Sequence, residues 1–295
     1  MGSYANLLYE TKGHLAKITL NRPEKLNALS ADLRNELDVA VQAADDDREV
    51  RVLIIRGSGR AFSAGYDLSG GARPGAYQGA RTLEDSIYTL RRSGERWMHL
   101  LWNMRKPVIA QVHGFCMAGG NDLAGSSDII IAAEDAIFAV PQARALGIHH
   151  TLGFWPLTIG MRKTKEIMYC GDAISGKEAE RIGMINRSVP EEKLEETVDR
   201  LANRIAILPT TLLQSHKQCI NRWYEIMGVD AMVRTADEFD AIANKTEAGD
   251  RFREISQSKG LKAALEDRDT PYGGAYTNWW DGNLLTPKLA KPQKK

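Results

Sequence analysis

Residues 113–123 read HGFCMAGGNDL and directly follow the apolar stretch VIAQV at 108–112. A short apolar stretch of this kind is typical of a strand that is buried on both faces, and the small residues after it predict a tight loop that opens a helix over 120–126. A second loop of the same kind, GRAFSAGYDL at 59–68, follows the apolar stretch VLIIR at 52–56. Buried strands that alternate with helices indicate parallel strand pairing and an α/β fold.

The segments around these two loops fit the same fold class. Alternating residues over 7–20 predict a hairpin, and Ser30 stands where a side chain would cap a helix over 31–46. Another buried strand is expected at 129–132. After Pro141 the pattern becomes helical, so we expect the carboxyl half to be mostly helical. Helices are expected over 82–103, 160–169, 175–183, 190–208, 210–227 and 230–244.

Charge and composition exclude several classes of protein. The 295 residues include 39 Lys and Arg against 38 Asp and Glu, so the chain has no broad basic field for binding nucleic acid. No apolar stretch approaches the roughly 20 residues that a membrane span needs. We therefore expect neither nucleic acid nor a membrane as a partner. Cys116, Cys170 and Cys219 are odd in number and lack metal-like spacing, which favours free thiols in a reducing compartment, taken as the cytoplasm, and no bound metal.

The glycine-rich loops can contribute chemistry as well as turns. Free backbone N–H groups at the start of a helix attract negative charge, and small residues let a ligand approach the main chain. Two such loops that face each other would supply two backbone donors to one oxygen atom, which is an oxyanion hole. The simpler alternative is that the glycines only form turns.

Six motifs, in their order along the chain, resemble the crotonase (enoyl-CoA hydratase/isomerase) superfamily over about residues 5 to 265. The motifs are NRPEKLNA at 21–28, AFSAGYDL at 61–68, the segment 114–128, FAVP at 138–141, GDAI at 171–174 and GMIN at 183–186. The resemblance implies a ββα spiral core followed by a helical region that forms homotrimers or dimers of trimers (hexamers). We therefore expect the core over 1–205 and the helical trimerisation region over 206–268. The lysine-rich end of the chain, which has nothing to bury, predicts an extended, partly disordered tail over 269–295.

The resemblance also implies roles for single residues. The amides of Tyr66 and Gly119 would form the oxyanion hole that holds a thioester carbonyl as it becomes an enolate. Lys25 would either contact a CoA phosphate or remain a solvated surface residue. No cofactor is implied, because coenzyme A arrives as part of the substrate. The residues that would line the CoA arm are Lys25, Leu26, Ala28, Ala64, Asp67 and Leu68.

The acid–base positions depart from the family's pattern. Typical hydratases of the family place one carboxylate three residues after the oxyanion-hole glycine and a second just after the Phe-x-x-Pro turn. One carboxylate activates water while the other transfers the proton on carbon. Here the first position is Asp122, and the second is Gln142, which cannot carry a proton. Asp122 would alternatively serve only as a cap of its helix.

A substitute for the second acid lies seven and eight residues beyond Gln142, where the chain carries His149 and His150. Histidine titrates near neutrality and suits either acid or base duty. Some relatives place a catalytic Asp about eight residues beyond the second acid position, which favours His150. The alternative is that one histidine caps a helix and the other faces solvent. Arg144 would either pair with Asp122 or reach a substrate carboxylate.

These features together predict an enzyme that acts on acyl-CoA thioesters through an oxyanion-stabilised enolate. Hydration or dehydration of an enoyl-CoA, a lyase reaction, is the family's commonest task and is the first hypothesis. Tyr66, Trp155 and Pro156 would add apolar wall for a bulky acyl group, and the alternative for Trp155 is core packing, the more frequent role of such a tryptophan. The second hypothesis is hydrolysis, or retro-Claisen or retro-aldol cleavage, of a β-oxo or β-hydroxy acyl-CoA, and double-bond isomerisation is the third. A CoA-binding scaffold with decayed activity is the non-enzyme alternative.

Overall fold

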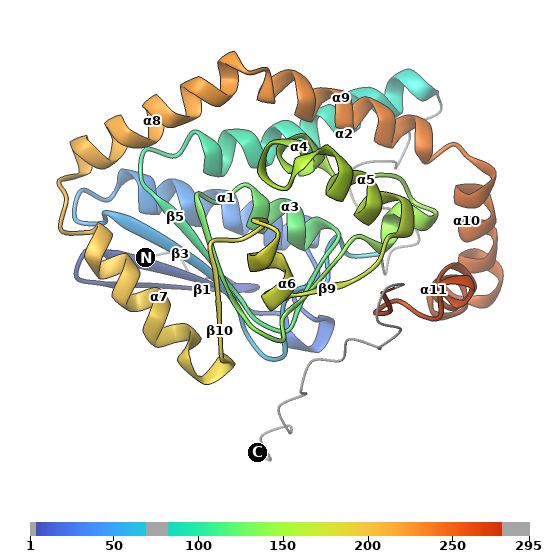
Figure 1. Ribbon diagram of the computed structural model, residues 1–295, viewed down its shortest axis with the longest axis horizontal. Helices are drawn as coiled ribbons and strands as arrows, with labels where there is room; N and C mark the ends of the chain where they lie inside the picture. Colours follow the sequence, from blue (N-terminus) through green and yellow to red (C-terminus); the bar gives the residue numbers. More distant parts are fainter. Residues whose placement is uncertain (1–3, 69–81, 279–295) are drawn as a thin grey trace.

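A six-stranded sheet forms the centre of the molecule, for which the computed structural model describes residues 4–68 and 82–278 (Figure 1). β1 and β2 form the antiparallel hairpin that the sequence predicts. The other neighbouring strands pair in parallel, so the predicted parallel pairing is confirmed. In spatial order the strands are β1 (Leu7–Lys12), β2 (Leu15–Leu20), β3 (Val52–Gly57), β5 (Val108–Val112), β7 (Ile129–Ala133) and β10 (Arg187–Val189).

A second, four-stranded sheet lies beyond what the sequence patterns predict, because its strands are too short to show a period. In spatial order they are β4 (Ala61–Ser63), β6 (Phe115–Met117), β8 (Ile137–Ala139) and β9 (Ile174–Ser175). The chain passes from β3 to β4, from β5 to β6 and from β7 to β8, so a long strand is followed each time by a short strand of the second sheet. Helices follow β4 and β6, and this repeated step is the expected ββα spiral.

Helices make up most of the described chain after Pro141, as the sequence predicts. α1 (Ala31–Asp46) begins at the predicted cap, because the Ser30 side chain accepts a hydrogen bond from the Leu33 amide at 3.2 Å. Within the described ranges, no helix combines the length and the apolar character needed to cross a membrane. The other helices are α2 (Leu83–Trp97), α3 (Gly119–Gly125), α4 (Trp155–Thr158), α5 (Gly160–Cys170), α6 (Gly176–Arg181), α7 (Glu191–Ile205), α8 (Thr210–Ile226), α9 (Val229–Ala243), α10 (Glu247–Lys259) and α11 (Leu261–Asp269). Shorter helical turns are η1 (Pro23–Lys25), η2 (Met98–Trp102), η3 (Pro141–Arg144), η4 (His150–Phe154) and η5 (Thr270–Tyr272).

The core lies between the large sheet and the helices that cover it. Ile54, Ile55 and Ile109 on the central strands are completely buried, and burial of each side chain contributes roughly 1.5–3 kcal/mol. α1 packs against β1 and β2, and α7 packs against β3, β5 and β7. This packing fixes the carboxyl ends of β3 and β5, from which the two glycine-rich loops start.

The last described segment folds back on the core. α10 and α11 pack against each other, and beyond η5 the Tyr276 ring lies on the Phe115 ring with 5.1 Å between the ring centres. Asn278, the last described residue, is also buried. The remainder of the tail expected over 269–295, residues 279–295, lies outside the described residues.

Candidate active site

The two glycine-rich loops lie against each other beyond β4 and β6. A Cβ atom added to Gly65 would lie 2.8 Å from the Ala118 Cβ and 3.0 Å from the Gly119 nitrogen, so only glycine permits this close approach. Gly119 is the first residue of α3, and the N–H of a first helical residue has no carbonyl partner within its helix. The fold therefore brings the Gly119 amide next to the backbone that leads into Tyr66, the other predicted donor.

Ala118 holds a strained backbone conformation just before this amide. Its φ is 47° and its ψ is −118°. A positive φ is unfavourable for a residue that carries a side chain, and this conformation costs on the order of 1–3 kcal/mol. The Ala118 amide donates to the Ala139 carbonyl at 3.0 Å, and the Ala118 carbonyl accepts from the Asn121 amide at 2.9 Å. Hydrogen bonds on both sides thus hold the strained residue and fix the direction of the Gly119 amide.

A cavity of about 470 Å³ opens beside the two loops. The Tyr66 ring lies over Gly119, since a Cβ added to that glycine would come within 2.8 Å of the ring. A further wall comes from residues near the end of the described chain, which sequence reasoning does not assign to the site: Leu265, Glu266, Arg268, Asp269, Thr270, Gly274, Ala275 and Tyr276. The predicted site residues that line the cavity are Leu26, Ala64, Tyr66, Leu68 and Gln142.

The other three residues predicted to bind CoA, Lys25, Ala28 and Asp67, lie outside the lining of this cavity as the described residues form it. Lys25 ends η1 and is exposed. Asp67 is buried, and its carboxylate forms an ion pair with Arg22 at 3.0 Å. Arg22 also donates to the Ala28 carbonyl at 2.6 Å. Arg22 therefore ties the segment after β2 to the loop after β4, a role that its place in the first motif could have suggested.

Asp122 lies on α3, one turn after Gly119, and only 1% of its surface is exposed. Its Oδ1 accepts hydrogen bonds from the Thr151 amide at 3.1 Å and the Thr151 hydroxyl at 3.3 Å, and His149 Nδ1 lies 3.3 Å away. Burial alone would raise the pKa of this carboxyl, but the contact with His149 and the charge of His150 outweigh burial and lower the pKa. Asp122 is therefore an ionised carboxylate that binds across to another segment instead of capping its own helix.

His150 begins η4 and is buried against α9, where its Nδ1 donates to Asp237 Oδ1. Burial alone would lower the pKa of His150. The hydrogen bond to Asp237 and the charges of Asp122, Asp237 and Asp240 outweigh burial and raise the pKa to about 9. His150 is therefore an imidazolium at neutral pH. Sequence reasoning misses Asp237, because 87 residues separate it from His150 and no local motif marks it.

His149 is buried as well, so the alternative in which one histidine faces solvent is wrong. Its ring packs on Trp155, with 4.4 Å between the ring centres, and its Nδ1 lies 3.1 Å from the Thr151 hydroxyl. Trp155 belongs to the buried core, where it packs against the His149 ring. It does not line the cavity as the described residues form it, so the prediction that Trp155 adds to the acyl wall is wrong.

Tyr66 links the cavity to the acid–base cluster, by which we mean Asp122, His149, His150 and Asp237. Its side chain lines the cavity, and its ring meets the His150 ring edge-on with 6.0 Å between the ring centres. Among the described residues, no member of the cluster lines the cavity. Within the cluster, His150 therefore meets the wall of the cavity at the Tyr66 ring.

Comparison with known proteins now adds to this geometry. Residues 10–275 match the family model described as enoyl-CoA hydratase/isomerase. The chain belongs to this family. The predicted family and fold are thereby confirmed.

Relatives and solved structures of the family match nearly the whole chain. A crotonyl-CoA hydratase from Syntrophomonas wolfei is 34% identical over 272 residues, which cover 90% of this chain and 97% of the relative. A short-chain-enoyl-CoA hydratase from Clostridium acetobutylicum is 32% identical over 269 residues, covering 89% and 95%. The crystal structure of an enoyl-CoA hydratase/isomerase from Xanthobacter autotrophicus Py2 has a TM-score of 0.83 at 34% identity, covering 91% of this chain and 99% of that one.

Gln142 follows Pro141, where the family's typical hydratases would carry their second carboxylate. It is buried and lines the cavity, and its Oε1 has no hydrogen-bond partner within the described residues. An amide can orient a bound group, but it cannot exchange a proton. Gln142 therefore cannot take the proton-transferring role of the carboxylate that typical hydratases carry at this position.

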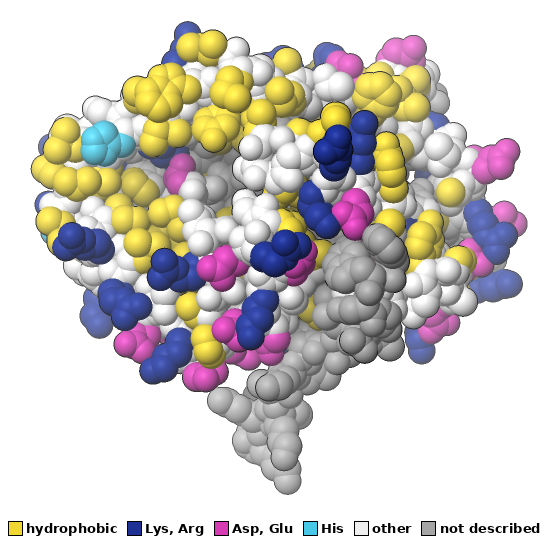
Figure 2. Space-filling view, in the orientation of Figure 1, with side chains coloured by type: hydrophobic (Ala, Val, Ile, Leu, Met, Phe, Trp, Pro, Cys, Tyr) yellow, Lys and Arg dark blue, Asp and Glu magenta, His cyan; other side chains and the backbone are white. Residues whose placement is uncertain are grey.

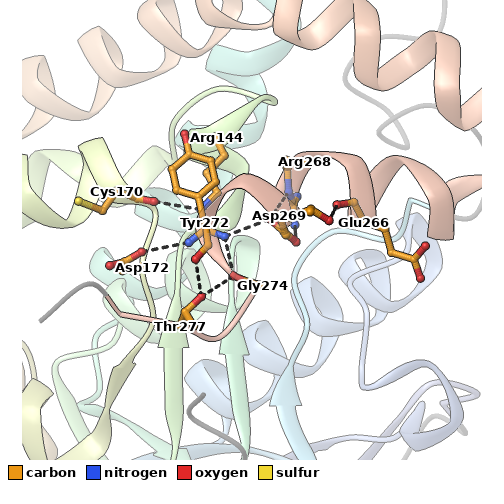
Figure 3. A network of polar contacts seen from close by, with 10 residues as sticks. Arg144, Cys170, Asp172, Glu266, Arg268, Asp269, Tyr272, Gly274 and Thr277 are labelled. Atoms are coloured by element: carbon orange, nitrogen blue, oxygen red, sulfur yellow. Dashed lines mark hydrogen bonds and ion pairs between the residues drawn. The ribbon is translucent and has the colours of Figure 1, made fainter. Parts of the chain in front are cut away.

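Arg144 has partners other than the two considered for it, so both alternatives are wrong. Its guanidinium is fully buried and forms ion pairs with Asp172 at 3.1 Å and Asp269 at 3.2 Å (Figure 3). It also donates to the Gly274 carbonyl at 3.0 Å and lies 4.2 Å from the centre of the Tyr272 ring. Arg144 thereby clamps the segment after α11 in place, and that segment forms part of the cavity wall.

Replacement of this clamp by Arg144→Met is expected to destabilise the protein. The change removes two buried ion pairs, and breaking such a pair costs about 3–5 kcal/mol. We expect a lower free energy of unfolding in urea and weaker binding of an acyl-CoA by calorimetry. Arg251→Met is the control, because Arg251 forms an exposed ion pair with Asp267 and such pairs contribute about 0–1 kcal/mol. Equal stability of the two variants would contradict the clamp.

Proposed function

We propose that this protein is an enoyl-CoA hydratase, a lyase that adds water across the conjugated double bond of an acyl-CoA thioester and removes it in the reverse direction. The observation that carries the proposal is the buried acid–base cluster, whose His150 ring contacts the Tyr66 ring in the cavity wall. In this cluster Asp122, at the family's first acid position, lies with His150, an imidazole held by a second carboxylate. The hydratase names of the relatives from Syntrophomonas wolfei and Clostridium acetobutylicum support the same reaction.

The proposed mechanism uses four groups of the chain. The amides of Tyr66 and Gly119 donate to the thioester oxygen and stabilise the enolate. Asp122 accepts a proton from water as the water oxygen bonds to Cβ of the substrate's acyl chain. The electron pair of the substrate's double bond then moves toward the thioester. The His150 imidazolium then gives its proton to Cα, which completes the addition. A proton passes from Asp122 back to His150, by way of solvent, and restores the starting state.

The charge states of the cluster favour hydration over the other reactions. Hydration needs a base and an acid at the same pH, and a pair of groups whose environments push their pKa values apart meets that need. Asp122, with a lowered pKa, and His150, with a pKa of about 9, form such a pair. Cleavage and isomerisation need one good base, and a decayed scaffold needs neither group. A scaffold would thus leave both ionised groups without a role, whereas hydration uses both of them.

We extend the proposal to a bulky acyl group. The cavity has a volume of about 470 Å³. Its walls contain apolar side chains in addition to those of the residues that the sequence predicts. In the proposed reaction coenzyme A enters with the substrate, and no separate cofactor takes part. The additional apolar lining residues are Met117, Pro141, Leu146, Leu265 and Tyr276.

The test is a panel of enoyl-, β-hydroxy- and β-oxo-acyl-CoAs with short, long and aromatic acyl groups, followed by mass spectrometry. We expect the enoyl thioesters to gain one water without loss of carbon, and the β-hydroxy thioesters to lose one. Heat-treated protein is the control for uncatalysed addition. Cleavage of the chain or of the thioester, or binding without turnover, would reject the hydratase proposal.

We also propose that the protein assembles as a homotrimer or a dimer of trimers in the cytoplasm. Hydrophobic side chains gather over α8 and α9 along the upper edge of the molecule (Figure 2). Trp223 on α8 is 60% exposed, Ile226 on α8 is 76% exposed, and Phe239 on α9 is 57% exposed. Such a patch on helices that pack together is typical of a subunit interface. Cys116, Cys170 and Cys219 are free thiols, which fits a reducing compartment.

The double variant Trp223→Asp/Ile226→Asp is expected to convert the assembly into monomers, because an interface would bury two unpaired charges. Light scattering coupled to gel filtration measures the mass of each species. Tyr169→Asp is the control, since Tyr169 on α5 is 75% exposed and lies outside the α8 and α9 patch. A wild-type protein that already has the mass of a monomer would reject the proposed assembly.

A further inference from the structure

Helix α9 presents two buried carboxylates, one helical turn apart, to the segment that leads into His150. Asp240 Oδ1 accepts a hydrogen bond from the Ile148 amide at 2.8 Å. Gly147, just before it, has a φ of 107°, and a Cβ added there would overlap Asp240 Oδ1. Asp240 therefore holds the backbone of this segment, while Asp237 contacts the His150 ring.

Asp237 differs from Asp240 in what its carboxylate binds. Its Oδ1 binds the imidazole, and its Oδ2 is buried without a hydrogen-bond partner in the part of the chain that the structure describes. Burial of a carboxylate with an open oxygen is unfavourable unless a charge compensates it. The compensating charge here is the imidazolium of His150. A purely structural role would be served as well by a neutral side chain, so the carboxylate points to a role in proton transfer.

We propose that Asp237 is a positioning residue for His150: its carboxylate holds the ring by Nδ1, so that Nε2 is the nitrogen that gives its proton to the enolate carbon. This inference rests on the proposed hydratase function. The two ring nitrogens of histidine are distinct, and a partner on one nitrogen fixes both the ring orientation and the nitrogen left for substrate. The pair of Asp237 and His150 thus takes the place of the second carboxylate of typical hydratases, at whose position this chain carries Gln142.

The groups around His150 decide how strongly Asp237 acts on it. Replacement of Asp237 by Asn leaves only a neutral hydrogen bond in place of a charge-assisted one and also removes a Coulomb attraction, whereas replacement of Asp240 by Asn removes a Coulomb attraction on His150 alone. Asp237→Asn and Asp240→Asn are therefore a matched pair on one helix. The titratable groups that face His150 come from α3, α9, the segment before η4 and the loop after β4: Asp122, Asp237, Asp240, His149 and Tyr66.

The kinetic experiment compares Asp237→Asn with Asp240→Asn and Asp237→Glu in hydration of an enoyl-CoA from the panel. For Asp237→Asn we expect a loss of about 10²-fold in kcat, with KM almost unchanged. The alkaline limb of kcat/KM should move from about pH 9 toward the ordinary value of 6.5. Asp240→Asn should move that limb less, and Asp237→Glu should restore part of the rate. An alkaline limb that stays in place in Asp237→Asn would overturn the positioning role.

A second measurement needs no turnover, so it separates this inference from the proposed function. Titration of ¹⁵N-labelled histidine by NMR should show one imidazole of the wild type that stays protonated to about pH 9, and this resonance should be absent in His150→Gln. A His150 resonance with an ordinary titration in the wild type would overturn the pairing even if Asp237→Asn fails to fold. A high titration in a protein that hydrates no enoyl-CoA would keep the pairing and reject the hydratase proposal.

Discussion

Asp122→Asn is expected to lower kcat for hydration by about 10³-fold or more and to leave the affinity for a saturated acyl-CoA almost unchanged. Asparagine has the size of aspartate, and its amide oxygen still accepts the hydrogen bonds that Thr151 donates. It cannot accept a proton from water, so the loss falls on the chemical step and not on binding. Steady-state kinetics and calorimetry with the saturated thioester measure the two effects.

Asp267→Asn is the control for this loss, because Asp267 on α11 forms an ion pair with Arg251 away from the acid–base cluster. We expect its kcat to match that of the wild type. If Asp122→Asn retained most of the wild-type kcat, the assignment of Asp122 as the base would be wrong. Weak binding of the saturated thioester by Asp122→Asn would instead assign Asp122 a structural role.

His150→Gln is expected to lower kcat by about 10²-fold or more and to abolish the alkaline limb of the pH profile. In the wild type, kcat/KM should fall as the pH rises through about 9, because the imidazolium loses the proton that it donates. The acid limb should lie below 3.8, because the pKa of Asp122 is lowered from that value. Hydration rates across this pH range, for both proteins, measure the two limbs. A rate that rises through pH 9 would make His150 the base instead of the acid.

The same proton contributes to the stability of the folded protein. The folded pKa of His150 is raised from 6.5 to about 9, so its stabilising contribution is complete below 6.5 and is lost as the pH rises through about 9. The pKa of Asp237 is raised by burial to about 6, so ionisation of Asp237 costs stability as the pH rises through that value. The advantage of the wild type over His150→Gln in urea unfolding should therefore shrink as the pH rises from 6.5 to about 9.

Local patterns predict the parts of the fold that depend on neighbouring residues. The apolar stretch at 108–112 coincides with β5, and the Ser30 cap is correct because capping involves residues within one turn. The strands of the second sheet escape prediction, because three residues such as Ala61–Ser63 hold too short a pattern to show alternation. The positions of these short strands are set by the long strands that precede them in the chain, and therefore by the fold as a whole.

The residues of the candidate site also fall into two groups, those that local sequence patterns predict and those that only the folded structure reveals. Asp122 and the two glycine-rich loops lie in continuous motifs, so their sequence suffices to find them. Asp237 is an ordinary carboxylate on an amphipathic helix, and only the packing of α9 against η4 gives it a histidine to bind. The expected partners of Arg144 are wrong for a related reason. Asp269 lies 125 residues further along the chain, at the start of the segment that the sequence analysis expects to be an extended tail.

The strained backbone at Ala118 favours the proposed reaction but lowers the stability of the fold. Because folding fixes the direction of the Gly119 amide before any ligand arrives, the proposed oxyanion hole would offer a substrate a donor that needs no rearrangement, and the full interaction of this donor would remain for the developing negative charge. The cost appears in the free energy of unfolding, where a relaxed loop would be more favourable. Selection for a faster enzyme and selection for a more stable one therefore act in opposite directions at this single residue.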